Sequence, residues 1–548
     1  GGSSSSGGNG GGTTLQDKYV EKEFGSDKTI SEKMDLSSIN ADSVIGILAH
    51  NSNIKNETEI TINDKSNGSK IMALSSDEAK NVLDFYQKNG ESFAIFSDGG
   101  SVVNTANGKL NITGDKVTGI LGIYSDITNE GLISTTENEK NSVEASGIIT
   151  LGGNVTNKGT IDIHSHEGVG IYAMNGIKIE DANIEVKDDA IKVINENKIS
   201  IIGEESRGIV AAGNNITVTN NGELYVKGTD VDGIVGQEGQ NITIENGKNG
   251  TITAENKGGK LADGKYMSGI NIKDKGKNTQ AVITNDGTIN ITGAEGNYFA
   301  YGITGDGQMT VTNNGTIKVN TKTHLESAGI NIENGEATNN NEIIIEAQYN
   351  KFVGEDLSYN LANASKGMKA TKNGKIINGE KGKITVSGSA IGMYTTTEAV
   401  NNGTIEITGK SENADDYMTS MGMVADGGKI TNEEKGTIQS DLADINGMLV
   451  IGNGTGENFG TINLSGNEVE AMTAENGNII NHKDITLSGE SSIGMRVDVG
   501  TGENKGTITI GGFDSWGMSA GNSSTIKNTK GTINVNGENS VGMIAENG

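Results

Sequence analysis

One short motif, Asn-x-Gly-Thr-Ile-x followed by Ile, Val or Leu, recurs along the chain and constrains its fold more than any other feature. A chain that repeats a unit of about 20 to 50 residues builds a solenoid or a propeller, because each unit buries its apolar face only against its neighbours. The motif occurs at residues 157–163, 285–291, 313–319, 401–407, 458–464 and 504–510.

A second motif, Ser-x-Gly-Met or Ser-x-Gly-Ile, follows the first at a fixed distance. The offset is 11 residues from Gly506 to Gly517 and again from Gly531 to Gly542. A third segment of the form x-Ile-x-Asn closes the unit, as in Thr525–Asn528. Successive first motifs near the C-terminal end lie 23 to 25 residues apart. Three short strands per unit of about 23 residues predict an all-β fold, a right-handed parallel β-helix.

The residues within each strand predict which side chains face inward. Side chains alternate along a strand, so Ile508 and Ile510 should point into the helix bore and Thr507 and Thr509 away from it. The Asn of the first motif should bond to the Asn one turn above, and its glycines should sit at corners or at close backbone approaches. Methionines recur at one slot of the second motif, where other turns carry Ile, and we expect this column to be core.

Composition excludes several classes of function. The chain of 548 residues has 82 Gly, no Pro and no Cys, so it forms no disulfide and uses no thiol chemistry. Its net charge of −28, with only two arginines, argues against nucleic-acid binding, which requires neutralisation of phosphates. No apolar run approaches the roughly 20 residues of a membrane helix.

Three regions are predicted along the chain. Residues 1–14 form a Gly/Ser-rich linker, and residues 15–107 form degenerate β-helix turns with a helical insertion at about 76–87. Residues 108–548 form the regular β-helix, with stacked loop insertions over 255–421. One face of the helical insertion is apolar and should pack on the β-helix; it comprises Ala79, Val82, Leu83 and Tyr86. We expect the sequence to be a fragment of a longer chain.

With its stacked motifs, its richness in Gly and Asn and its lack of Cys and Pro, the chain resembles the β-helical passengers of type V autotransporters. It is most similar to the large fusobacterial outer-membrane adhesins of the RadD type. The resemblance implies a passenger on the cell surface that attaches to host cells or other bacteria, as in coaggregation and biofilms. It also implies anchoring in the outer membrane through a C-terminal β-barrel that is absent from this sequence.

No residue pattern for catalysis or metal binding stands out. A GDSGS-type serine-protease loop is absent, and the adjacent pairs Asp188-Asp189 and Asp415-Asp416 are poorly placed for acid–base work. His164 to Glu167 could offer metal ligands, but an exposed corner is the favoured interpretation. The same holds for a calcium site at Asp230 to Gly233. We therefore expect no enzyme activity, no catalytic residue, no metal and no cofactor.

Loop insertions at one corner give the candidate binding surface. The offset between the two motifs grows to 19, 15, 14, 26 and again 19 residues, always after the first strand. Because equal positions stack in a β-helix, the loops should line one edge. They cover residues 255–268, 294–301, 321–328, 347–366 and 410–421 and hold 8 of the 21 aromatic residues of the chain.

This loop edge is predicted to bind a partner, since binding surfaces favour Tyr. Its candidate residues are Tyr266, Tyr298, Phe299, Tyr301, Tyr349, Phe352, Tyr359, Tyr417, Asp263, Glu355, Asp356, Asp415 and Asp416. The expected partner is a host-cell or bacterial surface protein or glycan. Three alternatives remain open: aromatics that only pin the loops to the helix wall, a passive spacer that presents a distal tip, and a polysaccharide-acting β-helix enzyme.

Overall fold

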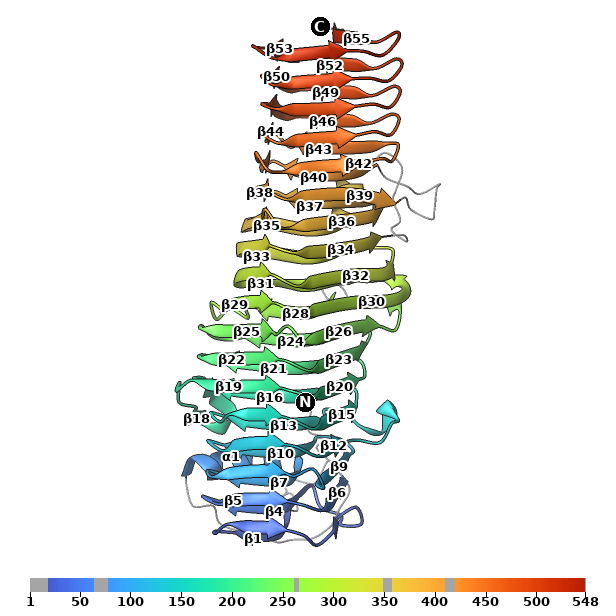
Figure 1. Ribbon diagram of the computed structural model, residues 1–548. Coiled ribbons are helices and arrows are strands. Elements are labelled where there is room, and N and C mark those ends of the chain that lie inside the picture. The colour runs from blue at the N-terminus through green and yellow to red at the C-terminus, as the bar shows by residue number, and fades with distance from the viewer. Residues whose placement is uncertain (1–17, 64–76, 261–265, 348–356, 410–418, 548) are drawn as a thin grey trace, which may run out of the picture. The chain divides into compact units, whose positions relative to one another are not determined.

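The computed structural model describes residues 18–63, 77–260, 266–347, 357–409 and 419–547. The chain divides into an N-terminal unit, Gly1–Asn256 with Ile270–Val282, and a C-terminal unit, Lys257–Gly269 with Ile283–Gly548. Within each unit the strands stack coil upon coil in parallel ladders, as the arrows of Figure 1 show. The fold is the predicted parallel β-helix.

Each regular coil contributes one strand to each of three ladders. Ladder 1 carries the first motif and comprises β3 (Met34–Asp35), β6 (Glu59–Asn63), β9 (Lys109–Thr113), β12 (Leu132–Ser134), β15 (Thr160–His164), β20 (Lys198–Ile202), β23 (Glu223–Gly228), β26 (Thr251–Asn256), β27 (Gly259–Lys260), β30 (Thr288–Asn297), β32 (Thr316–Thr323), β34 (Glu342–Ala347), β36 (Lys383–Gly388), β39 (Thr404–Gly409), β42 (Thr437–Ser440), β45 (Thr461–Leu464), β48 (Asp484–Leu487), β51 (Thr507–Ile510) and β54 (Thr532–Val535).

Ladder 2 carries the second motif and comprises β1 (Lys18–Phe24), β4 (Ser43–His50), β7 (Ser92–Asp98), β10 (Val117–Ile123), β13 (Ser146–Leu151), β16 (Val169–Asn175), β21 (Arg207–Gly213), β24 (Asp232–Gln237), β28 (Tyr266–Lys273), β31 (Phe299–Asn313), β33 (Ser327–Asn339), β35 (Ser365–Asn378), β37 (Ala390–Thr395), β40 (Ser420–Asp426), β43 (Ile445–Ile451), β46 (Glu470–Ala474), β49 (Ile493–Val497), β52 (Trp516–Ala520) and β55 (Val541–Ala545). The three long strands β31, β33 and β35 continue from ladder 2 into ladder 3.

Ladder 3 comprises β2 (Lys28–Ile30), β5 (Asn53–Asn56), β8 (Ser101–Asn104), β11 (Asp126–Asn129), β14 (Val155–Asn157), β19 (Ile191–Asn195), β22 (Ile216–Asn220), β25 (Ile242–Asn246), β29 (Gln280–Asn285), β38 (Glu398–Asn401), β41 (Lys429–Asn432), β44 (Gly454–Asn458), β47 (Gly477–Asn481), β50 (Gly500–Asn504) and β53 (Thr525–Asn528). The remaining elements among the described residues are the antiparallel hairpin β17 (Lys178–Ile179) and β18 (Ile184–Glu185), the short 3₁₀ turns η1 (Glu139–Asn141) and η2 (Glu180–Ala182), and the helices α1 (Asp77–Lys88) and α2 (Leu357–Asn363).

The interior of each unit is built from stacked aliphatic columns. In β51, Ile508 and Ile510 are fully buried while the two threonines are half-buried, as the alternation predicted. In ladder 2 of the C-terminal unit, Met495 pairs with Met518, and both are 0% exposed, so the methionine column is core. Such columns bury apolar area that a single coil leaves exposed.

Glycine in the two motifs is required by close backbone approach. A Cβ atom at Gly159 would lie 2.1 Å from the carbonyl oxygen of Gly131 in the adjacent coil. At Gly170 it would lie 2.5 Å from the carbonyl oxygen of Gly208. Neither glycine has a positive φ, so sterics between coils, and not a left-handed turn, select the residue.

A column of buried asparagines closes ladder 3 in each unit. In the C-terminal unit the Asn432 side-chain amide donates to Asn458 Oδ1 at 2.8 Å, and Asn458 donates in the same way to Asn481 at 2.8 Å. In the N-terminal unit Asn104, Asn129 and Asn157 continue an identical chain with distances of 2.9 Å. The predicted asparagine stacking is therefore confirmed, and it satisfies polar groups inside an otherwise apolar wall.

The two helices cover the outward face of ladder 2, each in its own unit. Helix α1 occupies the place where a helical insertion was expected, and its buried Ala79, Val82 and Leu83 pack against Phe96 and Leu121. Helix α2, which the sequence analysis did not predict, packs Leu361 against Ile391, Tyr394, Val424 and Leu449. Within the described residues, no helix combines the length and apolarity needed to cross a membrane.

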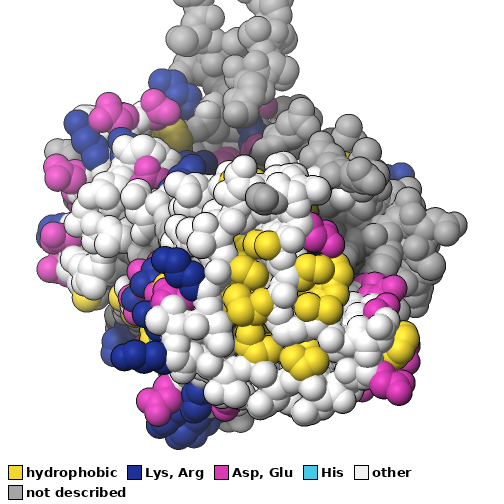
Figure 2. All heavy atoms as spheres, turned by 90° about the horizontal axis from the view of Figure 1, so that it is seen from above, with side chains coloured by type: hydrophobic (Ala, Val, Ile, Leu, Met, Phe, Trp, Pro, Cys, Tyr) yellow, Lys and Arg dark blue, Asp and Glu magenta, His cyan; other side chains and the backbone are white. Residues whose placement is uncertain are grey.

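The last described coil shows how far each coil depends on the next. Val535 and Met543 are 39% and 43% exposed, whereas Ile510 and Met518 at the equivalent slots one coil earlier are fully buried. Figure 2 views this coil end-on and shows apolar side chains gathered at its centre. The interior side chains of a coil are therefore covered by the coil that follows it and not by other side chains of the same coil.

A charge in the bore should break the stack locally. Ile508→Asp places an unpaired carboxylate in the dry interior, which costs several kcal/mol, so it should sharply lower the melting temperature of the C-terminal unit. Thr509→Asp, on the half-buried outward side of the same strand, should change stability by only about 0.5 kcal/mol. Thermal unfolding followed by circular dichroism measures both, and equal losses would show that the two faces are assigned wrongly.

The asparagine column should contribute measurably to stability. Asn458→Ala removes the acceptor of the Asn432 amide and leaves buried polar groups unpaired, which costs roughly 1–3 kcal/mol for each group. The matched control is Asn463→Ala, at an exposed position of β45, where the expected change is within about 0.5 kcal/mol. Urea unfolding compares the two; similar small losses would mean that the column is dispensable.

Candidate functional site

The loop insertions all leave ladder 1 on their way to ladder 2. Four of them follow β30, β32, β34 and β39 of the C-terminal unit, and residues 257–265 precede β28. Parts of these insertions are ordered extensions of the sheet, since β30 runs on to Asn297 and β32 to Thr323. Eight predicted site residues lie outside the described residues: Asp263, Tyr349, Phe352, Glu355, Asp356, Asp415, Asp416 and Tyr417.

The five described candidates differ in their surroundings. Tyr298 is completely buried, and its hydroxyl donates to the Ala294 carbonyl at 2.7 Å, so it holds its own loop against the wall. Tyr359 on α2 is 42% exposed. The other three, Tyr266, Phe299 and Tyr301, come together around one cavity.

This aromatic cavity encloses about 420 Å³ on the outward face of β31, β33 and β35. The rings of Tyr266 and Tyr301 meet edge to face with their centroids 5.5 Å apart. Thr304, Asn331 and Lys369 line it from paired positions of the three strands. The remaining lining residues are Phe299, Gly305, Asp306, Glu326, Glu333, Ala362, Asn363 and Thr371.

A network of buried charged groups lies next to the cavity and contributes Tyr301, Glu326 and Lys369 to its lining. The Tyr301 hydroxyl donates to Glu326 Oε1 at 2.8 Å, and the same carboxylate accepts from Lys366 and, at 3.1 Å, from Lys369. The ammonium of Lys366 is fully buried and also donates to the Ala364 carbonyl at 2.6 Å, just after α2. The network therefore ties the segment that follows α2 to the floor of the cavity.

The burial of these groups sets their protonation. Burial raises the pKa of Glu326, but the positive charges of Lys366 and Lys369 outweigh it and hold that pKa below its usual range. Burial lowers the pKa of Lys366 to about 8, against the opposing effect of Glu326. Burial, reinforced by the Glu326 charge, raises the pKa of Tyr301 well above 10, so its hydroxyl remains a donor at neutral pH.

The sequence held a signal for this network that the motif analysis missed. Lys366 occupies the x position of a Ser-x-Gly-Met motif, and its partners in the next two coils are Ile391 and Met421. A lysine in an otherwise apolar column indicates a buried ion pair. The neighbouring column is polar in three coils, with Thr304, Asn331 and Lys369. In the next two coils it continues with Tyr394 and Val424, which α2 covers on the outward face of ladder 2.

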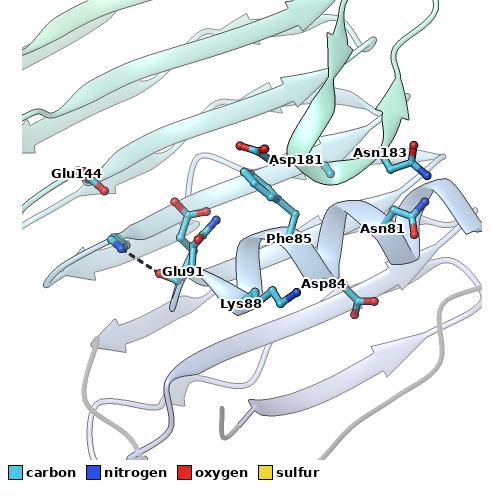
Figure 3. Close-up of a pocket in the computed structure, with 11 residues that line it drawn as sticks. Asn81, Asp84, Phe85, Lys88, Glu91, Glu144, Asp181 and Asn183 are labelled. Carbon is cyan, nitrogen blue, oxygen red and sulfur yellow. Dashed lines mark hydrogen bonds between the residues drawn. The ribbon is translucent and has the colours of Figure 1, made fainter. Parts of the chain in front are cut away.

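A second cavity of about 620 Å³ lies in the N-terminal unit, between α1 and the η2 turn. Figure 3 shows Phe85, Asp181 and Glu91 around it, with Glu144 further along. Glu91 Oε2 is buried and makes no hydrogen bond. Burial, reinforced by the charge of Glu144, raises the pKa of Glu91 to about 8 despite the opposing Lys116.

The histidine and aspartate motifs have separate structural roles. His164 pairs with Asp162 at 3.1 Å and not with His166. Ligand atoms of His166, Glu167 and Glu205 lie within 4.8 Å of one another at a corner of the N-terminal unit. Asp232 pairs with Arg207 at 3.0 Å and with Lys273 at 3.8 Å, so its charge is already balanced by cations of the protein.

Comparison with known proteins identifies the family. The model of the BigA third pectate lyase-like domain matches residues 125–342, 322–436 and 467–548, together more than two thirds of the chain. The chain therefore belongs to the family of the BigA third pectate lyase-like domain, a class of β-helical domains. No curated protein and no solved structure matches the sequence. The closer resemblance to RadD-type adhesins stays a prediction.

The raised pKa of Glu91 predicts a pH-dependent stability of the N-terminal unit. The folded carboxyl keeps its proton up to about pH 8, whereas the unfolded carboxyl loses it near 4.5. The contribution to stability is therefore complete below the unfolded value and is lost as the pH rises toward 8, by up to about 1.4 kcal/mol per pH unit.

Glu91→Gln should flatten this dependence. Urea unfolding at pH 5 and pH 8 should show a smaller difference for Glu91→Gln than for the native chain. The exposed Glu130→Gln is the control and should keep the native difference. An unchanged pH dependence in Glu91→Gln would contradict the assignment.

Proposed function

We propose that this chain is the surface-exposed passenger region of a bacterial adhesin, which attaches to host cells or to other bacteria through the aromatic cavity of the C-terminal unit. The observation that carries the proposal is the gathering of Tyr266, Phe299 and Tyr301 around one cavity at the predicted loop edge. Aromatic side chains with a polar rim are typical of recognition surfaces.

Membership in the BigA family supports a place at the cell surface. The absence of cysteine is compatible with export of an unfolded chain, and a net charge of −28 speaks against nucleic acid as a partner. Attachment to the outer membrane through a C-terminal β-barrel, and a role in coaggregation, are part of the proposal.

The cavity's carboxylates support binding over catalysis. Glu326 is neutralised by Lys366 and Lys369, and Glu333 pairs with Lys372 at 3.2 Å. A glycan-acting enzyme instead needs two carboxyl groups that are placed on either side of a bond, one of them available as an acid. We therefore propose a non-enzymatic role that requires no cofactor.

The buried network gives the cavity the rigidity that specific binding needs. A contact surface that is ordered before binding loses less conformational entropy on association. The lysine that ties the segment after α2 to Glu326 is fully buried, which favours a cavity that is ordered before a ligand binds.

Adhesion of the purified chain tests the proposal. Beads coated with the native chain should bind epithelial cells or partner bacteria, and Phe299→Ala should weaken this binding by roughly thirtyfold, the cost of about 2 kcal/mol for a central aromatic anchor. The matched control is Phe513→Ala, which truncates a 47% exposed aromatic residue that does not line the cavity.

Both variants should keep the native melting temperature. Undiminished adhesion of Phe299→Ala would favour the passive spacer, whose distal tip makes the contact. A large fall in melting temperature would instead mean that Phe299 pins its loop to the wall.

A further inference from the structure

We propose that the aromatic cavity of the C-terminal unit binds an uncharged saccharide. This inference rests on the proposed function and names the class of ligand that the adhesin recognises. The sequence alone left two ligand classes open, because an edge rich in acids and tyrosines suits cationic proteins as well as sugars.

The charge balance of the cavity separates these two classes. Its described lining residues include three acids, Asp306, Glu326 and Glu333, and one cation, Lys369. Two further lysines pair with two of these acids, the buried Lys366 with Glu326 and the exposed Lys372 with Glu333. Three positive charges therefore stand beside three negative ones, so the described lining carries no excess of negative charge that would favour a cation.

The polar groups of the cavity offer both donors and acceptors, as the hydroxyls of a sugar require. The Asn331 amide donates to Thr304 Oγ1 at 3.0 Å, which fixes its orientation and leaves a second N–H and the amide oxygen for a ligand. Lys369 is 21% exposed and adds a charged donor, while the Glu333 carboxylate, 29% exposed, adds an acceptor. Hydrogen bonds to charged groups are the stronger ones.

The aromatic side supplies the apolar part of sugar recognition. Phe299 and Tyr266 are half-buried, so each ring is held by the protein and still partly open. The Tyr266 ring is further fixed by its edge-to-face contact with Tyr301. A pyranose has apolar C–H faces that pack on such rings. The volume of about 420 Å³ lies in the range of small-ligand sites.

Binding to an array tests the inference. The probes are neutral hexose and N-acetylhexosamine oligosaccharides, their sialylated and sulfated counterparts, and polylysine. We expect the native chain to bind neutral oligosaccharides, with an affinity that changes by less than about twofold when ionic strength rises tenfold. Phe299→Ala should weaken the binding by about tenfold or more, and Phe513→Ala should leave it unchanged.

Asn331→Asp is the sharpest variant, because it removes an N–H donor and adds a negative charge in nearly the same volume. It should weaken the binding of a neutral saccharide, whereas it would strengthen the binding of a cationic ligand. Salt-sensitive binding of polylysine that Asn331→Asp enhances would overturn the inference in favour of a cationic protein. Binding of charged glycans alone would also overturn it.

The experiment separates failure of the inference from failure of the proposed function. If no neutral saccharide binds while cell adhesion still requires Phe299, the saccharide inference is wrong and the adhesin proposal stands. If a neutral saccharide binds through Phe299 while Phe299→Ala adheres to cells normally, the cavity is a sugar site that adhesion does not use.

Discussion

The hydrogen bonding between one coil and the next is the interaction on which the rest of the structure depends. Parallel strands place equal sequence positions above one another, so Ile485 lies over Ile508 and Asn481 over Asn504. This register turns a sequence repeat into columns of aliphatic side chains and of asparagine amides. Each side chain in a column is packed or hydrogen-bonded by the equivalent residues of the adjacent coils. The backbones of adjacent coils come so close at the motif glycines that no larger residue fits there.

The same register explains where a site can form. A residue that differs from the others in its column still contacts the equivalent residues of the coils above and below. Lys366 lies in an apolar column, so its buried ammonium group requires the carboxylate of Glu326 as a partner. In both units a helix covers an apolar stretch of the outward face of ladder 2, and a cavity lies beside it. The helical insertions thus convert a uniform wall into a surface with distinct local chemistry.

The sequence predicted much of the fold and only part of the candidate site. The strand alternation, the methionine column and the asparagine column follow from periodicity and are found in the structure. Helix α2 was not predicted, because seven residues within a long insertion carry too little periodic signal. Tyr298 shows why the site was predicted only in part. The enrichment in aromatic residues located the loop edge, but it could not distinguish a buried tyrosine that holds its own loop from a ring that is accessible to a ligand.

The sequence by itself determined the coil, the register and the corner at which insertions leave, since a repeat fixes local strand geometry and the stacking of equal positions. Only the tertiary structure decided which insertion residues meet. Tyr266, Tyr301 and Glu326 belong to three different coils, and their contacts depend on how each loop returns to ladder 2. The tertiary structure also decided the charge balance of the cavity, because the lysines that pair with its acids come from another strand. The energy of an ion pair depends on distance and burial, and a sequence pattern records neither.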